Sequence, residues 1–270
     1  MRVVATYSIK GGVGKTSAAV NLGALAAQEG RRTLLWDLDP QGAASFLLRV
    51  KPKVKGGGRK LVRGRRDPLT VMKGTDFEGL DLLPADLSYR HLDLVLDKSK
   101  RPLRGLGRVL GSLADEYDVA ILDCAPSISL VSESVFDAAD LLLVPLVPST
   151  LSVRTLEQLR KFLARQEQPA PEVLPFFSMV DRRKRLHREL VESVPGAGGA
   201  IVPSASIIEL MGPRREPVVV SHPRSPAAQA YTALWAEVRG ALNGAQRPQA
   251  ALASSSLEGS DEAREQAAPE

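Results

Sequence analysis

The chain has 270 residues, of which 44% are hydrophobic and 25% charged, and a formal net charge of +5 at pH 7. These values fit one soluble α/β domain with a tail, and the charge permits, without requiring, an acidic partner such as DNA or an anionic membrane. The single cysteine, Cys124, excludes an internal disulfide and an intrachain cysteine-ligated iron–sulfur cluster. No apolar run reaches the about 18 residues of a membrane-spanning helix.

The first element in chain order is a buried strand at residues 3–7. It runs into a glycine-rich turn and then into an alanine-rich helix predicted at 16–28. A strand, a glycine-rich turn and a helix start are the context of a phosphate-binding loop, whose backbone N–H groups point at phosphate oxygens. Because this strand and the glycine-rich turn occupy the first residues of the sequence, we expect no signal peptide. We therefore expect a cytoplasmic protein. The candidate nucleotide-binding residues of the loop are Lys10, Gly11, Gly12, Val13, Gly14, Lys15, Thr16 and Ser17.

Three carboxylates follow two further predicted strands. Asp37 and Asp39 come after the strand at 33–36, and Asp123 ends the apolar strand at 119–123. Ligands of open α/β sheets bind at the carboxyl ends of strands, so these side chains are expected to face the phosphate-binding loop. Each carboxylate alone also fits a turn or a helix cap, but the ordered set favours a nucleotide and metal site.

The phosphate-binding loop departs from the usual pattern, because residue 9 is isoleucine and a second lysine, Lys10, stands before the glycines. With Asp-Leu-Asp-Pro-Gln at 37–41 and the strand that ends at Asp123, this loop resembles the deviant Walker A motif of the ParA/MinD family of ATPases. The resemblance implies ATP and Mg²⁺ as cofactors.

The same resemblance implies roles for individual residues. Lys15 would contact the β- and γ-phosphates, and Lys10 would reach the nucleotide of a partner subunit across an ATP-bound homodimer. Asp39 would position or activate the attacking water, which makes Lys10, Lys15 and Asp39 the catalytic candidates. Thr16, Asp37 and Asp123 would surround the metal.

The rest of the chain continues the alternation of strands and helices. It predicts a single-domain α/β fold over 1–244, with a mostly parallel twisted sheet flanked by helices on both faces. Residues 245–270 are rich in Ala, Ser, Gln, Glu and Pro, which predicts a disordered acidic tail. Further strands are expected at 80–83, 141–146, 173–179 and 200–203, and further helices at 86–96, 103–116, 131–138, 150–165 and 227–242.

Residues 51–67 form a basic segment with several glycines and no apolar periodicity. We expect a flexible loop inserted in the domain. Two interpretations remain open: a loop that neutralises DNA phosphates, and a solvated insertion. The absence of interleaved aromatic residues argues against base stacking.

The resemblance also suggests contacts outside the phosphate-binding loop. Met179, Asp181 and Pro203 occupy positions that flank the nucleoside in the family, although Asp181 also fits a helix start with exposed arginines. Arg224 lies near a position that is basic in DNA-binding members, and a set of solvated loop arginines is the alternative interpretation. The DNA-binding candidates are Arg224, Arg214, Arg215, Lys60 and Arg63.

Together these features favour a ParA-like partitioning ATPase with slow intrinsic turnover. It would form an ATP-dependent dimer, bind DNA non-specifically and respond to a ParB-like or other activating partner. One alternative is a MinD-like membrane-associated positioning ATPase. The acidic end of the chain lacks the basic amphipathic helix of that class, so no membrane partner is expected. The other is an ATP-driven scaffold that binds no DNA.

Overall fold

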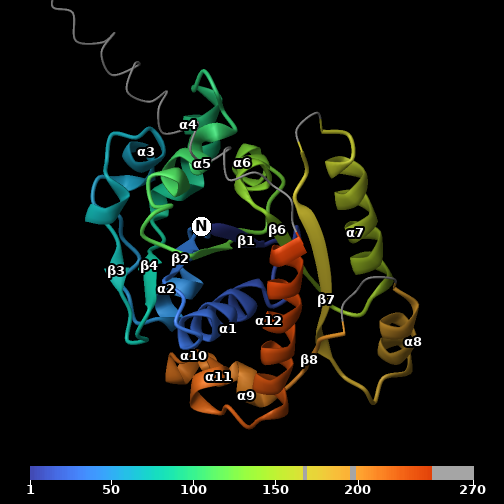
Figure 1. Ribbon diagram of the computed structural model, residues 1–270. Helices are drawn as coiled ribbons and strands as arrows, with labels where there is room; N and C mark the ends of the chain where they lie inside the picture. Colours follow the sequence, from blue (N-terminus) through green and yellow to red (C-terminus); the bar gives the residue numbers. More distant parts are fainter. Residues whose placement is uncertain (167–168, 195–198, 245–270) are drawn as a thin grey trace, which may run out of the picture.

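The computed structural model describes residues 1–166, 169–194 and 199–244; the expected acidic tail at 245–270 lies outside them. Helices enclose a central sheet within this part of the chain (Figure 1). Among the described residues, no helix combines the length and apolar character that crossing a membrane requires.

The sheet has eight strands in the order β3-β4-β2-β5-β1-β6-β7-β8. Every neighbouring pair is parallel except β3 and β4, which are antiparallel. The expected single-domain, mostly parallel α/β fold is therefore confirmed. The strands are β1 (Arg2–Thr6), β2 (Thr33–Asp37), β3 (Lys73–Gly74), β4 (Leu80–Leu83), β5 (Val119–Asp123), β6 (Leu141–Leu146), β7 (Glu172–Val180) and β8 (Ile201–Pro203).

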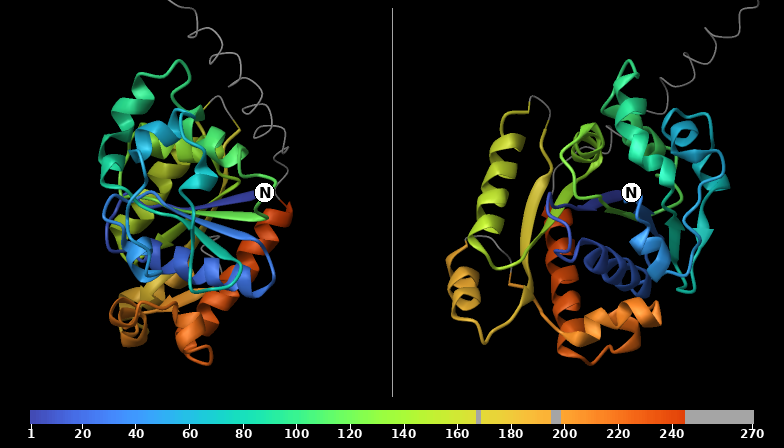
Figure 2. Two further views of the ribbon diagram at one scale, coloured as in Figure 1. Left: turned by 90° about the vertical axis from the view of Figure 1, so that its left-hand side faces the viewer. Right: turned by 180° about the vertical axis from the view of Figure 1, so that it is seen from behind.

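Helices cover both faces of the sheet, as the two views in Figure 2 show. One face carries α3 (Gly57–Val62), α4 (Leu92–Asp97), α5 (Arg104–Gly111), α6 (Leu130–Ala138) and α7 (Thr150–Leu163). The other face carries α1 (Lys15–Gln28), α2 (Ala43–Leu47), α9 (Ser206–Glu209), α10 (Met211–Arg214), α11 (Val218–Ser221) and α12 (Pro226–Gly244). The helix α8 (Arg185–Ser193) has no buried residue, and 3-10 helices lie at Pro68–Thr70 and Leu87–His91.

Successive residues of the central strands point to opposite faces, so the sheet separates two hydrophobic cores. In β2, Trp36 packs into the core beneath α3 to α7, while Leu35 packs into the core beneath α1 and α12. Strands buried on both faces are typical of parallel sheets and explain why these segments are apolar throughout.

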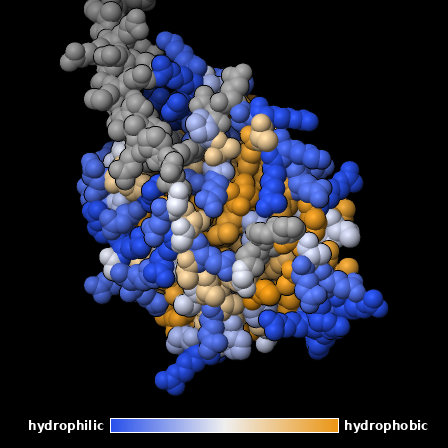
Figure 3. All heavy atoms as spheres, turned by 45° about the vertical axis from the view of Figure 1, so that its right-hand side comes forward, coloured by the Kyte–Doolittle hydropathy of each residue, from blue (hydrophilic) through white to orange (hydrophobic). Residues whose placement is uncertain are grey.

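On the side shown in Figure 3, polar side chains surround a central band of exposed apolar ones.

The expectation of a loop without regular structure at 51–67 is wrong, because this segment contains the helix α3. Leu61 and Val62 of α3 are buried, as is Val54 in front of it, and all three belong to the core beneath α3 to α7. The backbone N–H of Gly58 donates to Ser88 Oγ at 2.8 Å. The basic side chains project from a docked helix that non-local contacts stabilise.

Two predicted helices are shorter than the sequence pattern suggests. The helix expected at 103–116 is α5, which ends at Gly111, and 3-10-type bonds such as Leu113 N–H to Leu110 O continue the chain. The helix expected at 86–96 is divided into a 3-10 helix and α4. Asp86 caps the first of these, as a carboxylate oxygen accepts from Ser88 N–H at 2.9 Å.

Candidate nucleotide-binding site

Three strands end side by side at the edge where the phosphate-binding loop begins. Thr6, the last residue of β1, is in register with Asp123 of β5, which is in register with Asp37 of β2. Both carboxylates are fully buried. The parallel topology therefore brings residues that are distant in the sequence to one edge of the sheet.

The glycines of the loop adopt the conformations that a phosphate cradle requires. Gly12 and Gly14 have φ angles of 70° and 92°, in the left-handed region that glycine enters without a Cβ penalty. A Cβ on Gly14 would also lie 2.8 Å from Ser178 Oγ. Ser178 is a buried residue of β7 that the sequence motifs did not single out, and it closes this side of the loop.

Lys15 begins α1 and is 6% exposed. Its Nζ donates to the backbone oxygen of Lys10 at 3.1 Å. Burial lowers the pKa of the Lys15 ammonium, although the charges of Asp123 and Asp39 oppose this shift. The two lysines of the motif are thus connected through one hydrogen bond inside the loop.

Asp37 is bound by the segment that follows it. Its Oδ2 accepts from both the backbone N–H and the Oγ of Ser45, each at 2.8 Å. Burial raises the pKa of the Asp37 carboxyl to about 6, and the bonds from Ser45 oppose the shift. Ser45 also accepts from Ala85 N–H at 2.9 Å, so it connects the ends of β2 and β4. Ser45 was not among the predicted site residues, because no sequence pattern marks α2.

Asp123 has the most unusual environment of the three carboxylates. Its Oδ1 lies 3.4 Å from the Thr6 hydroxyl, whereas Oδ2 has no hydrogen-bond partner among the described residues. Burial and the charge of Asp37 raise the pKa of Asp123 to about 8, and the Thr16 hydroxyl opposes the shift. A buried carboxylate oxygen without a partner is suited to a cation or its bound water.

The donor set fits a magnesium ion shared with phosphates. Within residues 1–166, 169–194 and 199–244, no three carboxylate, histidine or cysteine side chains group closely enough to hold a metal alone. Mg²⁺ typically keeps several waters and binds through one or two carboxylates plus substrate phosphates. Thr16, near the start of α1, and Asp123 supply that kind of partial site, since the Thr16 hydroxyl lowers the pKa of the Asp123 carboxyl.

Asp39 starts a turn at the same edge. Its Oδ1 accepts from Gln41 N–H at 2.9 Å, and its own N–H donates to Asp37 Oδ1 at 3.3 Å. Gly42, at a φ of 68°, then allows the chain to enter α2. Asp39 is half-buried, so one side of its carboxylate remains accessible beside the loop.

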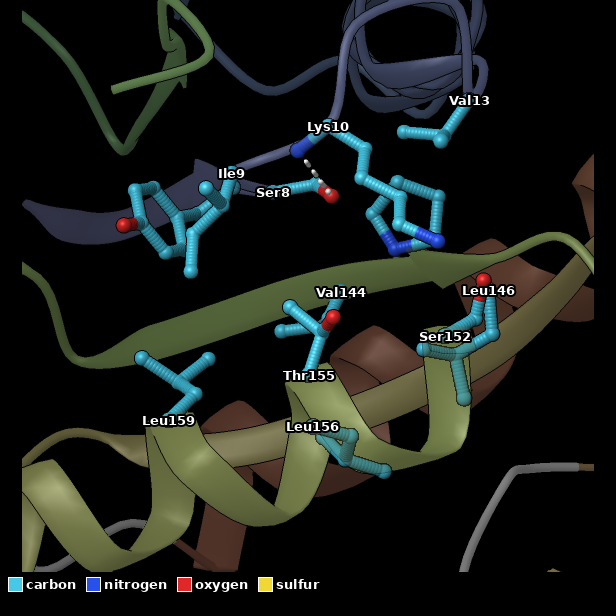
Figure 4. Close-up of a pocket in the computed structure, with 12 residues that line it drawn as sticks. Ser8, Ile9, Lys10, Val13, Val144, Leu146, Ser152, Thr155, Leu156 and Leu159 are labelled. Carbon is cyan, nitrogen blue, oxygen red and sulfur yellow. Dashed lines mark hydrogen bonds between the residues drawn. The ribbon is translucent and has the colours of Figure 1, made fainter. Parts of the chain in front are cut away.

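The side chain of Lys10 extends along its own subunit, toward a pocket between the phosphate-binding loop, β6 and α7 (Figure 4). Val144 and Leu146 of β6 and Thr155 of α7 line this pocket. The backbone N–H of Lys10 donates to Ser8 Oγ at 3.2 Å.

The residues expected beside the nucleoside lie near one another at the far side of the loop. Pro203 of β8 pairs in register with Val180 of β7, between Met179 and Asp181. Met179 is 39% exposed and has a φ of 57°. Asp181 pairs with Arg183 at 3.0 Å, and this guanidinium lowers the pKa of the carboxyl to about 2.

The five candidate DNA-binding residues fall into two groups rather than one patch. Lys60 and Arg63 belong to the α3 segment on one face of the sheet. Arg214 and Arg215 lie at the end of α10, and Arg224 lies between α11 and α12, on the other face. Figures 1 and 2 show α3 and α10 on opposite sides of the sheet.

A phosphate-binding loop, a buried lysine and two buried carboxylates on neighbouring parallel strands define a P-loop nucleotide-binding protein. A family model described as an AAA domain matches residues 1–173. The sporulation initiation inhibitor protein Soj of Bacillus subtilis (strain 168) is 30% identical over 254 residues, which cover 90% of this chain and 99% of Soj. The chromosome partitioning protein ParA of Myxococcus xanthus is 31% identical over 254 residues, with 88% and 87% covered.

Among solved structures, cobyrinic acid a,c-diamide synthase of Mycobacterium smegmatis with bound ADP and magnesium superimposes with a TM-score of 0.76. It is 27% identical, and the match covers 92% of this chain and 98% of that one. From these similarities, the chain belongs to the ParA/MinD family of P-loop ATPases.

Proposed function

We propose that this protein is an ATP-driven partitioning protein, which binds DNA non-specifically and positions or segregates DNA or another cargo. The observation that carries the ATPase part is the buried edge where Asp37 and Asp123 align beside Lys15. The partitioning part is supported by family membership and by the name of the Myxococcus xanthus relative.

The reaction is phosphoryl transfer to water, in which the protein contributes positioning and charge neutralisation. Lys15 leaves the Lys10 carbonyl and binds the β- and γ-phosphates, which the loop N–H groups also hold. Asp39 orients the attacking water. Thr16 and Asp123 would hold Mg²⁺, which would neutralise phosphate charge when bound. Asp37 orders the turn that carries Asp39, because Asp39 N–H donates to it.

The ATP-bound form is a homodimer that meets across the nucleotide edge. Ile128, after β5, and Leu151, at the start of α7, are 67% and 60% exposed there, so their apolar surface is available for burial between subunits. Lys10 turns from its own subunit toward the nucleotide of the partner. Turnover is slow and is stimulated by a ParB-like or other partner protein.

A sedimentation assay with duplex DNA, run separately with ATP and with ADP, tests this function. The protein should sediment with DNA in ATP and much less in ADP, and the fraction bound should fall as salt is raised. Lys15→Ala should lose ATP binding by calorimetry and, with it, the ATP-dependent DNA binding. Equal DNA binding with both nucleotides, or none with either, would contradict the proposal.

A further inference from the structure

The positive charge of the protein is concentrated in the α3 segment. Residues 51–66 contain eight lysine and arginine residues and no acidic residue, whereas the net charge of the whole chain is only +5. The rest of the chain is therefore acidic overall. Six of the eight cations are exposed, and we call these six the α3 basic surface: Lys51, Lys53, Lys55, Arg59, Lys60 and Arg65.

Carboxylates of the folded domain do not compensate this charge. None of the six residues forms an ion pair with a carboxylate in the described part of the chain. The two nearby carboxylates are engaged by backbone groups, because Asp67 accepts from Leu69 N–H at 3.0 Å and Asp86 accepts from Ser88 N–H at 2.9 Å. By contrast, Arg183 in the basic stretch before α8 is paired with Asp181 at 3.0 Å. The α3 basic surface thus keeps its charge for a ligand.

Exposed leucines lie beside these cations. The 3-10 helix at Leu87–His91 and α4 both pack against α3 (Figure 1), and Ser88 accepts from Gly58 N–H. Leu87 of the 3-10 helix and Leu94 of α4 are 63% and 61% exposed. Cations beside aliphatic side chains suit a peptide that carries both carboxylates and a leucine. Duplex DNA suits them less, since it offers phosphates and sugars on its outside and no aliphatic side chain.

The chain itself contains a segment of that chemistry. In residues 257–270, Leu257 is followed by five acidic residues and one arginine, Arg264. We call this the acidic segment; it lies outside the described residues. Its acidic residues are Glu258, Asp261, Glu262, Glu265 and Glu270.

The connection between the domain and the acidic segment is long enough to reach α3. The helix α12 ends at Gly244, and fourteen residues of chain lead from there to Glu258. Such a connection spans at most about 46 Å. A domain of this size has a radius of gyration of about 18 Å, so the opposite face of the sheet is within reach. A segment tethered in this way is present at an effective concentration on the order of millimolar.

We propose that the acidic segment docks on the α3 basic surface of its own subunit, with Leu257 against the exposed leucines. Each ion pair between exposed groups is weak, so the contact depends on several pairs together and is weakened by salt. The docked segment shields the cations from other polyanions. This contact goes beyond the proposed function and requires neither a nucleotide nor a second subunit.

Carbodiimide cross-linking of the full chain without nucleotide tests where the acidic segment lies, because this reagent joins a carboxylate only to an ammonium in contact with it. Mass spectrometry of the monomer band should find Glu258, Asp261, Glu262 or Glu265 joined to Lys53, Lys55 or Lys60, in a yield that falls as salt is raised. Lys161, exposed on α7, is the control and should not be joined to them. Equal yields at Lys161, or cross-links only in a band of doubled mass, would overturn the proposal.

A fluorescent peptide with the sequence of residues 256–270 tests the occupancy of the surface, again without nucleotide. The acidic segment is neutralised in the full chain by Glu258→Gln, Asp261→Asn, Glu262→Gln and Glu265→Gln. This variant should bind the peptide at least about fivefold more tightly than wild type does, because the surface of wild type is already occupied. Equal affinities for the two proteins would overturn the proposal.

Two matched pairs of substitutions locate the peptide site. Adding Arg59→Gln and Lys60→Gln to the neutralised variant should remove its gain in peptide affinity. Arg160→Gln and Lys161→Gln are the control, since they also remove an adjacent arginine and lysine from exposed positions in the last turn of a helix. A loss of affinity that is the same for both pairs would contradict the site. Since no nucleotide or DNA is present, these results are independent of whether ATP-dependent DNA binding is observed.

Discussion

At the residue scale, the buried carboxylate of Asp123 has a consequence for pH dependence. Burial raises its pKa to about 8, so between about pH 4 and pH 8 the folded protein keeps a proton that the unfolded chain has released. The free energy of unfolding must therefore decrease as pH rises through this interval. Above pH 8, the ion-free folded state holds Asp123 as a buried anion.

Asp123→Asn removes this titration. In EDTA and without nucleotide, the variant should gain stability relative to wild type as pH is raised from 5 to 8, because asparagine carries no charge to bury. Urea unfolding at the two pH values measures the difference. A stability difference that is the same at pH 5 and pH 8 would show that Asp123 does not titrate in this range.

Ser45 offers a second prediction at this scale. Ser45→Ala deletes the side-chain bond to Asp37 and leaves the buried N–H of Ala85 without its acceptor. We expect a loss of about 1–3 kcal/mol in the free energy of unfolding, since an unsatisfied buried polar group is costly. Ser193→Ala, an exposed serine on α8, is the control and should change stability by less than about 0.5 kcal/mol. Equal effects of the two substitutions would contradict this account.

At the element scale, α3 shows what a sequence pattern does not contain. The central strands are long apolar runs and their place in the fold is evident locally, whereas α3 contributes only the adjacent apolar pair Leu61 and Val62. Its stability comes from residues about 30 positions away, such as Ser88, which binds Gly58 N–H.

The sequence also predicts the nucleotide-binding site only in part. Asp37 and Asp123 were predictable as strand-terminal carboxylates, but Ser45 was not, because α2 has only five residues and no periodicity to detect.

The docking of α3 can be tested with one methyl group. A Cβ at Gly58 would overlap the ring of Tyr89, so Gly58→Ala should destabilise the protein by about 1–3 kcal/mol through overpacking. Gly107→Ala in α5 is the matched control, because nothing lies within 4 Å of its Cβ position. That control should be neutral or stabilising by up to about 1 kcal/mol from helix propensity. If Gly58→Ala proved as harmless as Gly107→Ala, α3 would not be packed as described.

At the scale of the whole molecule, the proposed dimer separates the roles of the two lysines. Lys10→Ala should still bind ATP, because Lys15 and the loop N–H groups remain, but it should stay monomeric in ATP by light scattering. Lys15→Ala should be monomeric because it binds no ATP. Wild type should double its mass with ATP and not with ADP. A Lys10→Ala variant that dimerises as wild type does would contradict the role of Lys10.

The two ends of the sheet bear on how copies of this protein meet. The described sheet is bordered by β3, two exposed residues that include Lys73, and by β8, three residues that end in Pro203. Short edge strands with a lysine or a proline offer little backbone for another strand to pair with. Lateral growth of the sheet into a chain of subunits is thereby discouraged. The proposed dimer instead meets at the nucleotide edge, where hydrolysis of the bound nucleotide would reverse the association.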